Sequence, residues 1–183
     1  MKSFEEQVKK LKDGTPVVIR EAHPLDAARL LTCIKTYIPQ SEYIPKLESE
    51  IIMTVGDEEL WIRSFAKNDN SLLLVAECNH QIIGNIDVTG SRRKVMEHTA
   101  VIGMGMMAEW RNRGLGSALM ESVLDWATDH PVLELLWLQV YGDNEAGIAL
   151  YKKMGFVETG RIGGFFRHNH RLSENVTMAR RVN

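Results

Sequence analysis

The chain has few cysteines, few prolines and no long apolar run. Its 183 residues include two cysteines, Cys33 and Cys78, and five prolines. The two cysteines lie far apart and lack metal-ligand spacing, which excludes a disulfide framework and a zinc ribbon and favours a reducing, cytoplasmic location. No apolar stretch approaches the roughly 18 residues of a membrane span. The charged start MKSFEEQVKKLKDG does not resemble a secretory signal.

An excess of charge of either sign is also missing. The 22 basic and 24 acidic residues leave a formal net charge of −2, so we expect neither a nucleic-acid partner nor a membrane partner. Hydrophobic residues make up 44% of the chain, which is an ordinary value for a globular protein. We therefore expect a single domain over 1–183, with its core in 17–180.

Apolar periodicity predicts a mixed α/β domain. The expected strands are short apolar runs at 17–20, 71–77, 81–89, 98–107, 132–141, 156–161 and 175–180. The expected helices have apolar residues at intervals of three and four, or a charged helical composition, and lie at 4–12, 26–38, 45–53, 58–65, 114–129 and 145–154. The segment 161–174 is expected to be a loop between the last two strands.

The junction between strand 98–107 and helix 114–129 carries the clearest chemistry. Gly114 and Gly116 open the helix, and Arg111 and Arg113 precede it. A helix that begins in a glycine-rich turn offers unpaired N–H groups and the positive end of its dipole, which together suit a phosphate. The Walker pattern is absent, and Leu119 replaces the third glycine of the dinucleotide pattern. Taken alone, the junction could equally be a plain glycine-rich turn.

A second motif follows at a fixed distance. Asn144, Gly147, Leu150, Tyr151 and the pair Gly155-Phe156 form an N-x-x-A-x-x-L-Y-x-x-x-G-F type of segment, with Gly147 where alanine is frequent. Together with Arg111-x-x-Gly114-x-Gly116, this segment resembles the GCN5-related N-acetyltransferase (GNAT) superfamily. The string GFVETGR at 155–161 is also typical of that superfamily, and the resemblance extends from 17–27 to 176–178.

The resemblance implies a central mixed sheet with two splayed strands, flanked by helices, and acetyl-CoA as co-substrate without a metal. The strand before the loop would pair with the pantetheine arm, the loop amides would hold the pyrophosphate, and an asparagine would bind the pantetheine. The implied cofactor-binding residues are Met104, Met106, Arg111, Asn112, Arg113, Gly114, Leu115, Gly116, Ser117 and Asn144.

Acyl transfer to an amine needs a proton donor for the leaving thiolate, and a neutral phenol can serve. The resemblance places Tyr151 near the sulfur, so Tyr151 is the candidate catalytic residue, while a backbone N–H near Met106 could stabilise the oxyanion. The general base is missing: Gln139 stands where some superfamily members have glutamate, and no spacing favours Glu97, Glu109 or Glu134. A missing base would favour an amine of low pKa.

The acceptor itself is not determined by the sequence. A small-molecule amine and a protein or peptide amine both remain open, and Tyr37, Tyr43 and Ile44 lie where the superfamily usually binds its acceptor. His168 and His170 share a loop but have no third ligand, so no metal site is expected. Two other functions stay open, a non-catalytic acyl-CoA-binding module and a nucleotide-binding protein, as does a homodimer.

Overall fold

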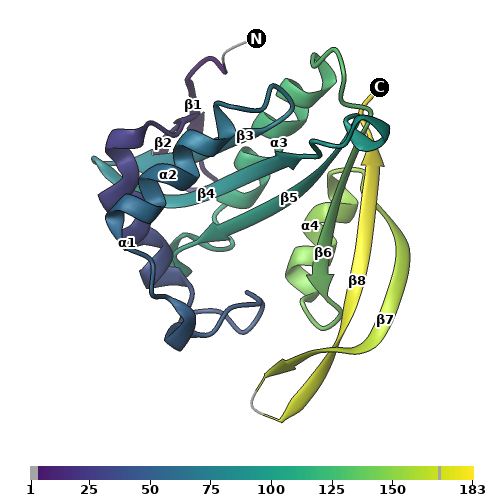
Figure 1. The fold of residues 1–183 in the computed structure, drawn as a ribbon. Coiled ribbons are helices and arrows are strands. Elements are labelled where there is room, and N and C mark those ends of the chain that lie inside the picture. The colour runs from purple at the N-terminus through teal and green to yellow at the C-terminus, as the bar shows by residue number, and fades with distance from the viewer. Residues whose placement is uncertain (1–3, 169) are drawn as a thin grey trace.

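The computed structural model describes residues 4–168 and 170–183, and these residues form one mixed sheet with helices on both faces (Figure 1). Within this part of the chain the sheet has eight strands in the order β1-β2-β3-β4-β5-β6-β8-β7. The strands are β1 (Gln7–Lys10), β2 (Pro16–Glu21), β3 (Leu72–Cys78), β4 (Gln81–Gly90), β5 (Thr99–Met106), β6 (Leu135–Tyr141), β7 (Val157–His168) and β8 (Arg171–Arg181). The predicted mixed α/β fold is confirmed.

Helices α1 (Ala27–Tyr37) and α2 (Val55–Phe65) cover one face of the sheet, and α3 (Leu115–Thr128) and α4 (Glu145–Lys153) cover the other (Figure 1). Successive side chains of a strand point to opposite faces, so β3 contributes to two separate cores. Leu73 and Val75 pack against α1 and α2, whereas Leu72 and Leu74 belong to the core beneath α3. None of the helices in the described chain has the length and hydrophobicity that a bilayer crossing requires.

Strands β5 and β6 form the only parallel pair among the described strands, and their pairing is short. It joins Thr99 to Leu135, Ala100 to Leu136 and Val101 to Trp137, and then it ends. Beyond Val101 the two strands diverge, as Figure 1 shows. On its other edge β5 stays paired with β4 as far as Met106. The edge of β5 from Ile102 to Met106 therefore faces an opening in the sheet, which is the splay that the sequence predicts.

Two predicted helices are wrong. Residues 4–12 contain β1 instead, which pairs with β2 through partners such as Val8 and Val18. The helical propensity of its charged residues is weaker than the gain from pairing with a sheet edge. Residues 45–53 form an irregular segment with one short 3₁₀ turn, Glu48–Glu50. Ile51 and Met53 pack against the core of α1 and α2, so the apolar residues here fill gaps rather than form a helical stripe.

The expected loop at 161–174 is also wrong, because β7 runs to His168 and β8 begins at Arg171, while residue 169 lies outside the described residues. The pairing of the two strands shifts register between Glu158 and Gly160 and again between Ile162 and Phe166. Glycines near these shifts let a strand bulge and then continue. The glycines of this region therefore mark irregularities inside a strand.

Candidate active site

The turn between β5 and α3 leaves backbone donors open. Gly114 is the N-cap of α3 with a φ of 97°, and Asn112 has a φ of 60°. The first backbone hydrogen bond into the helix runs from Ala118 N–H to the Gly114 carbonyl at 3.0 Å. Among the described residues, the N–H groups of Leu115, Gly116 and Ser117 have no acceptor. Open amides at the positive end of a 14-residue helix form a site suited to an anion.

Gly116 brings this turn against the strand and against α4. A Cβ atom at this position would lie 3.0 Å from Leu150 Cδ2 and 3.3 Å from Met106 Cε. Met104 Cε would lie 3.6 Å away. The structure therefore brings together the predicted strand residues, the predicted turn and the helix that carries Tyr151. A side chain at position 116 would require the ends of the Leu150 and Met106 side chains to shift by a few tenths of an ångström.

The two predicted arginines already have protein partners. Arg113 Nε lies 2.9 Å from Asp13 Oδ2, and its guanidinium lies 4.3 Å from the centre of the Trp110 ring. Arg111 donates to the Gln40 carbonyl at 2.8 Å, and Gln40 Oε1 accepts from Ala108 N–H at 2.9 Å. The charge of Arg113 is thus balanced by a carboxylate, whereas Arg111 contacts a neutral carbonyl.

Lys12 is a cation at this turn that the sequence reasoning missed. Its backbone N–H donates to the Arg113 carbonyl at 2.9 Å, and its Nζ donates to the Asn112 carbonyl at 3.3 Å. The side chain runs beside Gly114, where a Cβ would lie 3.4 Å from Lys12 Cγ. Residues 98–117 give no hint of this neighbour, because the segment that follows β1 supplies it from about 100 residues away.

Helix α4 positions Asn144 and Tyr151. Asn144 Oδ1 accepts from Gly147 N–H at 2.9 Å and caps the helix, which leaves the amide Nδ2 as a donor. An alanine Cβ at position 147 would lie 2.7 Å from that Nδ2, so glycine leaves room for the cap. Tyr151 packs edge-on against Phe156 at 6.2 Å between ring centres. Burial raises the pKa of Tyr151 to about 12, and the phenol is therefore neutral at pH 7.

The acids considered from the sequence lie away from this centre. Glu97 pairs with Lys94 at 2.9 Å, and Glu109 and Glu134 are exposed. Gln139 is exposed on β6, opposite Thr177 of β8. A different carboxyl group, Asp87 of β4, lies against the backbone of β5. The alternation of residues in β4 gave no signal for this contact, because only the paired strand reveals it.

The three residues expected near the acceptor separate in the structure. Tyr37 is buried and donates to Asn85 Oδ1 at 3.0 Å, and Ile44 packs against the core of α1 and α2. Tyr43 is 40% exposed and lies 5.9 Å from Tyr141, at the end of β6. A cavity of about 180 Å³ opens beside it. Its walls are Glu42, Tyr43, Tyr141, Asp143, His168, Arg171 and Ser173.

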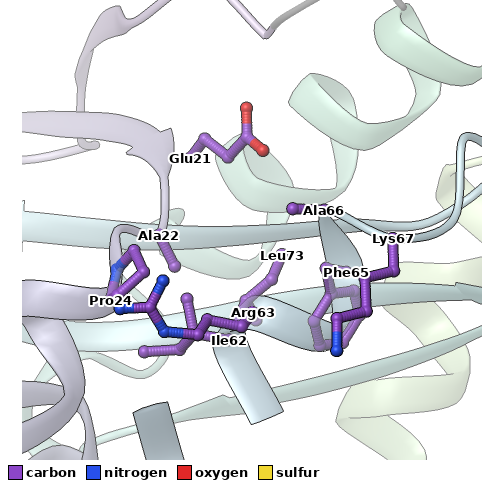
Figure 2. A pocket seen from close by; sticks show the side chains of 9 residues that line it. All are labelled: Glu21, Ala22, Pro24, Ile62, Arg63, Phe65, Ala66, Lys67 and Leu73. Carbon is purple, nitrogen blue, oxygen red and sulfur yellow. The ribbon is translucent and has the colours of Figure 1, made fainter. Parts of the chain in front are cut away.

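A larger cavity, of about 290 Å³, lies elsewhere. Figure 2 shows its lining, which comes from β2, α2, β3 and the segments that follow β2 and α2. The residues are Glu21, Ala22, Pro24, Ile62, Arg63, Phe65, Ala66, Lys67 and Leu73. None of these residues belongs to the turn, to β5 or to α4. In the described chain, no group of three or more His, Cys, Asp or Glu side chains is arranged to hold a metal ion.

Comparison with known proteins identifies the family. The profile of the acetyltransferase (GNAT) family matches residues 39–156. The chain belongs to the GNAT acetyltransferase family. The L-amino acid N-acetyltransferase AaaT of Escherichia coli (strain K12) is 27% identical over 123 residues, which cover 67% of this chain and 76% of that protein. The [ribosomal protein bS18]-alanine N-acetyltransferase of the same strain is 28% identical over 96 residues, covering 52% and 63% of the two chains.

Solved structures agree with this assignment. The crystal structure of a GNAT acetyltransferase from Streptococcus pneumoniae has a TM-score of 0.86 and 28% identity, and the match covers 91% of this GNAT chain and 99% of that one. The structure of yncA from Salmonella typhimurium, described with its cofactor acetyl-CoA, has a TM-score of 0.81. At 17% identity over 91% and 94% of the two chains, this second likeness concerns the fold alone. Relatives named as N-acetyltransferases support catalysis over the binding module that the sequence left open.

Proposed function

We propose that residues 1–183 are a single N-acetyltransferase domain that moves the acetyl group of acetyl-CoA to a primary amine by direct attack on the thioester. The observation that carries this proposal is the continuity of two sets of open backbone groups. The edge of β5 from Ile102 to Met106 is unpaired with β6, although the Met106 carbonyl accepts from Arg111 at 3.4 Å, and it leads to the open amides of Leu115, Gly116 and Ser117. The backbone groups of the β5 edge can form hydrogen bonds with the amides of a pantetheine arm. The N–H groups of the turn can bind a diphosphate.

Different residues of the chain bind the cofactor, stabilise the oxyanion and donate the proton. In this proposal the amides of 112–117 hold the diphosphate, and the backbone of Met104 and Met106 orients the pantetheine arm. Asn144 donates its free Nδ2 to that arm. A backbone N–H near Met106 binds the oxygen on which negative charge develops. Tyr151, kept neutral by its raised pKa, gives its proton to the departing sulfur.

For the acceptor we propose an α-amino group, on a free L-amino acid or at a peptide N-terminus. Two relatives carry names with such acceptors, an L-amino acid and an alanine of a ribosomal protein. The chemistry supports the same choice. An α-amine with a pKa of about 8 loses its proton at a cost of about 1 kcal/mol at pH 7, whereas a lysine amine costs about 4–5 kcal/mol. Gln139 offers no help with that proton.

A thiol-release assay tests the proposal. The protein is mixed with acetyl-CoA and a panel that contains the L-amino acids, an alanine-initiated peptide, an N-acetylated peptide with one lysine, and a polyamine. We expect the α-amines to give the highest kcat/KM, with the acetylated product identified by mass. Acetyl-CoA binding without thiol release for any amine would instead favour a sensing module. A cytoplasmic location and a homodimer remain predictions.

A further inference from the structure

Asp87 lies on the face of the sheet that α1 and α2 cover. Its neighbours in β4, Ile86 and Val88, belong to the core beneath α3, and side chains alternate along a strand. In the pairing with β5, Asp87 is opposite Gly103 and Asn85 is opposite Gly105. The Asp87 carboxyl group is therefore carried beside the strand that ends at the proposed cofactor turn.

The two glycines of β5 make room for groups from other elements. A Cβ at position 103 would lie 2.7 Å from Asp87 Oδ1, and a Cβ at position 105 would lie 2.3 Å from Tyr37 Cζ. The carboxylate and the phenol ring thus lie across the backbone of β5, where side chains of that strand would otherwise stand. Any larger residue at Gly103 would push the carboxylate away.

This placement brings Asp87 near the opening in the sheet. At Gly103, one edge of β5 is paired with β4, the strand that carries Asp87. The other edge of β5 is unpaired with β6 beyond Val101 and faces the opening in the sheet. Neighbouring strands lie about 4.8 Å apart. A carboxylate that lies over Gly103 is therefore about one strand spacing from the unpaired edge of β5 and about 10 Å along the strand from Met106, so an amine at the proposed thioester would reach it through water.

The chemical surroundings suit a base. Burial raises the pKa of Asp87 to about 6, and a hydrogen bond from Thr89 Oγ1 at 3.2 Å partly offsets that rise. Tyr37 of α1 interacts electrostatically with Asp87, and the same phenol interacts with Cys33 of α1 and Glu58 of α2. β5 contributes only its backbone at Gly103. A carboxylate of this kind is ionised at pH 7 yet basic enough to accept a proton.

We propose that Asp87 is the general base of the acetyl transfer, an inference that rests on the proposed function. The amine nitrogen forms a bond to the thioester carbon, and the carbon–sulfur bond breaks with its electron pair on sulfur. The proton that the nitrogen loses goes to Asp87, and the sulfur receives the proton of Tyr151. Return of the Asp87 proton through solvent to the Tyr151 phenolate restores both groups. Asp87 thereby takes the role that Gln139 cannot fill.

The first test replaces Asp87 by Asn and compares pH profiles, using the amine from the panel with the highest kcat/KM. We expect kcat/KM of Asp87→Asn at pH 7 to fall about 100- to 1,000-fold, with the affinity for acetyl-CoA unchanged by calorimetry. Below about pH 6, the slope of log kcat/KM against pH is expected to fall from about two to about one, because only the amine still titrates. Glu58→Gln is the matched control, with a buried carboxyl group on the same face and an unaltered profile.

Two further variants keep the test decisive if Asp87→Asn does not fold. Thr89→Val removes the hydrogen bond that favours the charged form of the Asp87 carboxylate. The bend near pH 6 in the plot of log kcat/KM against pH should therefore move to higher pH. Gly103→Ala should lower kcat through displacement of the carboxylate, and its effect should largely vanish when added to Asp87→Asn. Gly160→Ala, with open space around its Cβ, controls for the added methyl group.

The possible failures are distinguishable. If the unmodified protein releases no thiol with any amine, the proposed function fails. If it turns over, and Asp87→Asn keeps its rate within about twofold at pH 7, Asp87 is not the base and only this inference fails. An unmoved bend in Thr89→Val would overturn the inference in the same way.

Discussion

Single residues decide which charges at the site are available to a substrate. Hydrogen bonds from Thr15, and then from Arg113, lower the pKa of Asp13 to about 2, so the Asp13–Arg113 pair stays charged on both sides and neutral as a unit. Lys12 Nζ bonds to a carbonyl, and no carboxylate among residues 4–168 and 170–183 is paired with it. Tyr151, by contrast, is half-buried, and its raised pKa keeps it neutral. These charge states determine whether each residue can offer a charge to an anion or a proton to a leaving group.

Replacing Tyr151 by Phe tests the proton-donor role. We expect kcat to fall about 100-fold, because the thiolate must then leave without a donor. The dissociation constant of acetyl-CoA should stay within about twofold, since the ring still packs against Phe156. Single-turnover thiol release and calorimetry measure the two quantities. A parallel loss of binding and rate would instead assign Tyr151 to packing.

Replacing Lys12 by Ala tests whether its free charge serves the cofactor. We expect KM for acetyl-CoA to rise about three- to tenfold with little change in KM for the amine, because a partly exposed ion pair contributes about 1 kcal/mol. Lys10→Ala, on the same hairpin, is the control. CoA and 3′-dephospho-CoA are then compared as competitive inhibitors. If Lys12→Ala weakens the binding of both by the same factor, Lys12 contacts the diphosphate rather than the 3′-phosphate. Unchanged values for both ligands would contradict the prediction.

The sequence pointed to some of these residues and not to others, for a physical reason. Gly114 and Gly116 stand in a local motif, and the structure places both at the start of α3 as expected. Asn144 stands in the second motif, and in the structure it caps α4. Lys12 and Asp87 lie in segments without a motif. Their place depends on tertiary contacts with Asn112 and Gly103, which local spacing does not encode.

The elements were predictable where apolar periodicity was strong. The helix at 114–129 and the strand at 98–107 agree with α3 and β5 to within a few residues. Prediction failed in segments 4–12, 45–53 and 161–174, where the sequence is charged, irregular or rich in glycine. In the first and third of these, pairing with the neighbouring strand of a hairpin decides the structure, and the propensity of the single segment does not.

The contact between α1 and β5 makes Gly105 a test of element packing. Gly105→Ala places a methyl group 2.3 Å from the position of Tyr37 Cζ, and a rigid ring cannot yield without breaking its bond to Asn85. We expect the free energy of unfolding in urea to fall by about 1–3 kcal/mol. Gly163→Ala on β7, which meets nothing within 4 Å, should change it by less than about 0.5 kcal/mol. Equal values for the two variants would argue against tight α1–β5 packing.

For the molecule as a whole, buried carboxyl groups link stability to pH. Glu58 is 2% exposed, and its Oε1 is buried without a hydrogen-bond partner among the described residues. Burial raises its pKa from 4.5 to about 7, against a smaller opposing effect of Lys46. Below pH 4.5 the group is neutral in the folded and the unfolded chain, and its full contribution is present. As the pH rises toward 7 only the unfolded chain ionises, so stability is lost.

Unfolding in urea at pH 5 and pH 8 measures this dependence. We expect the free energy of unfolding to be lower at pH 8, with Glu58 contributing on the order of 3 kcal/mol and Asp87 acting in the same direction. Glu58→Gln should reduce the difference between the two pH values. A difference as large in Glu58→Gln as in the unmodified chain would show that Glu58 is ionised when folded.

Arg111 links the segment between α1 and α2 to the end of β5, because it donates to the Gln40 carbonyl at 2.8 Å and to the Met106 carbonyl at 3.4 Å. It reaches from the cofactor turn to the carbonyl of Gln40, in the segment between α1 and α2 that borders the proposed acceptor side. A phosphate that drew this guanidinium toward itself would remove one of the two hydrogen bonds that hold Gln40, so the affinities for cofactor and amine would be thermodynamically coupled, and coupled reciprocally. The order in which the two substrates bind is then expected to depend on a side chain that touches neither reacting atom.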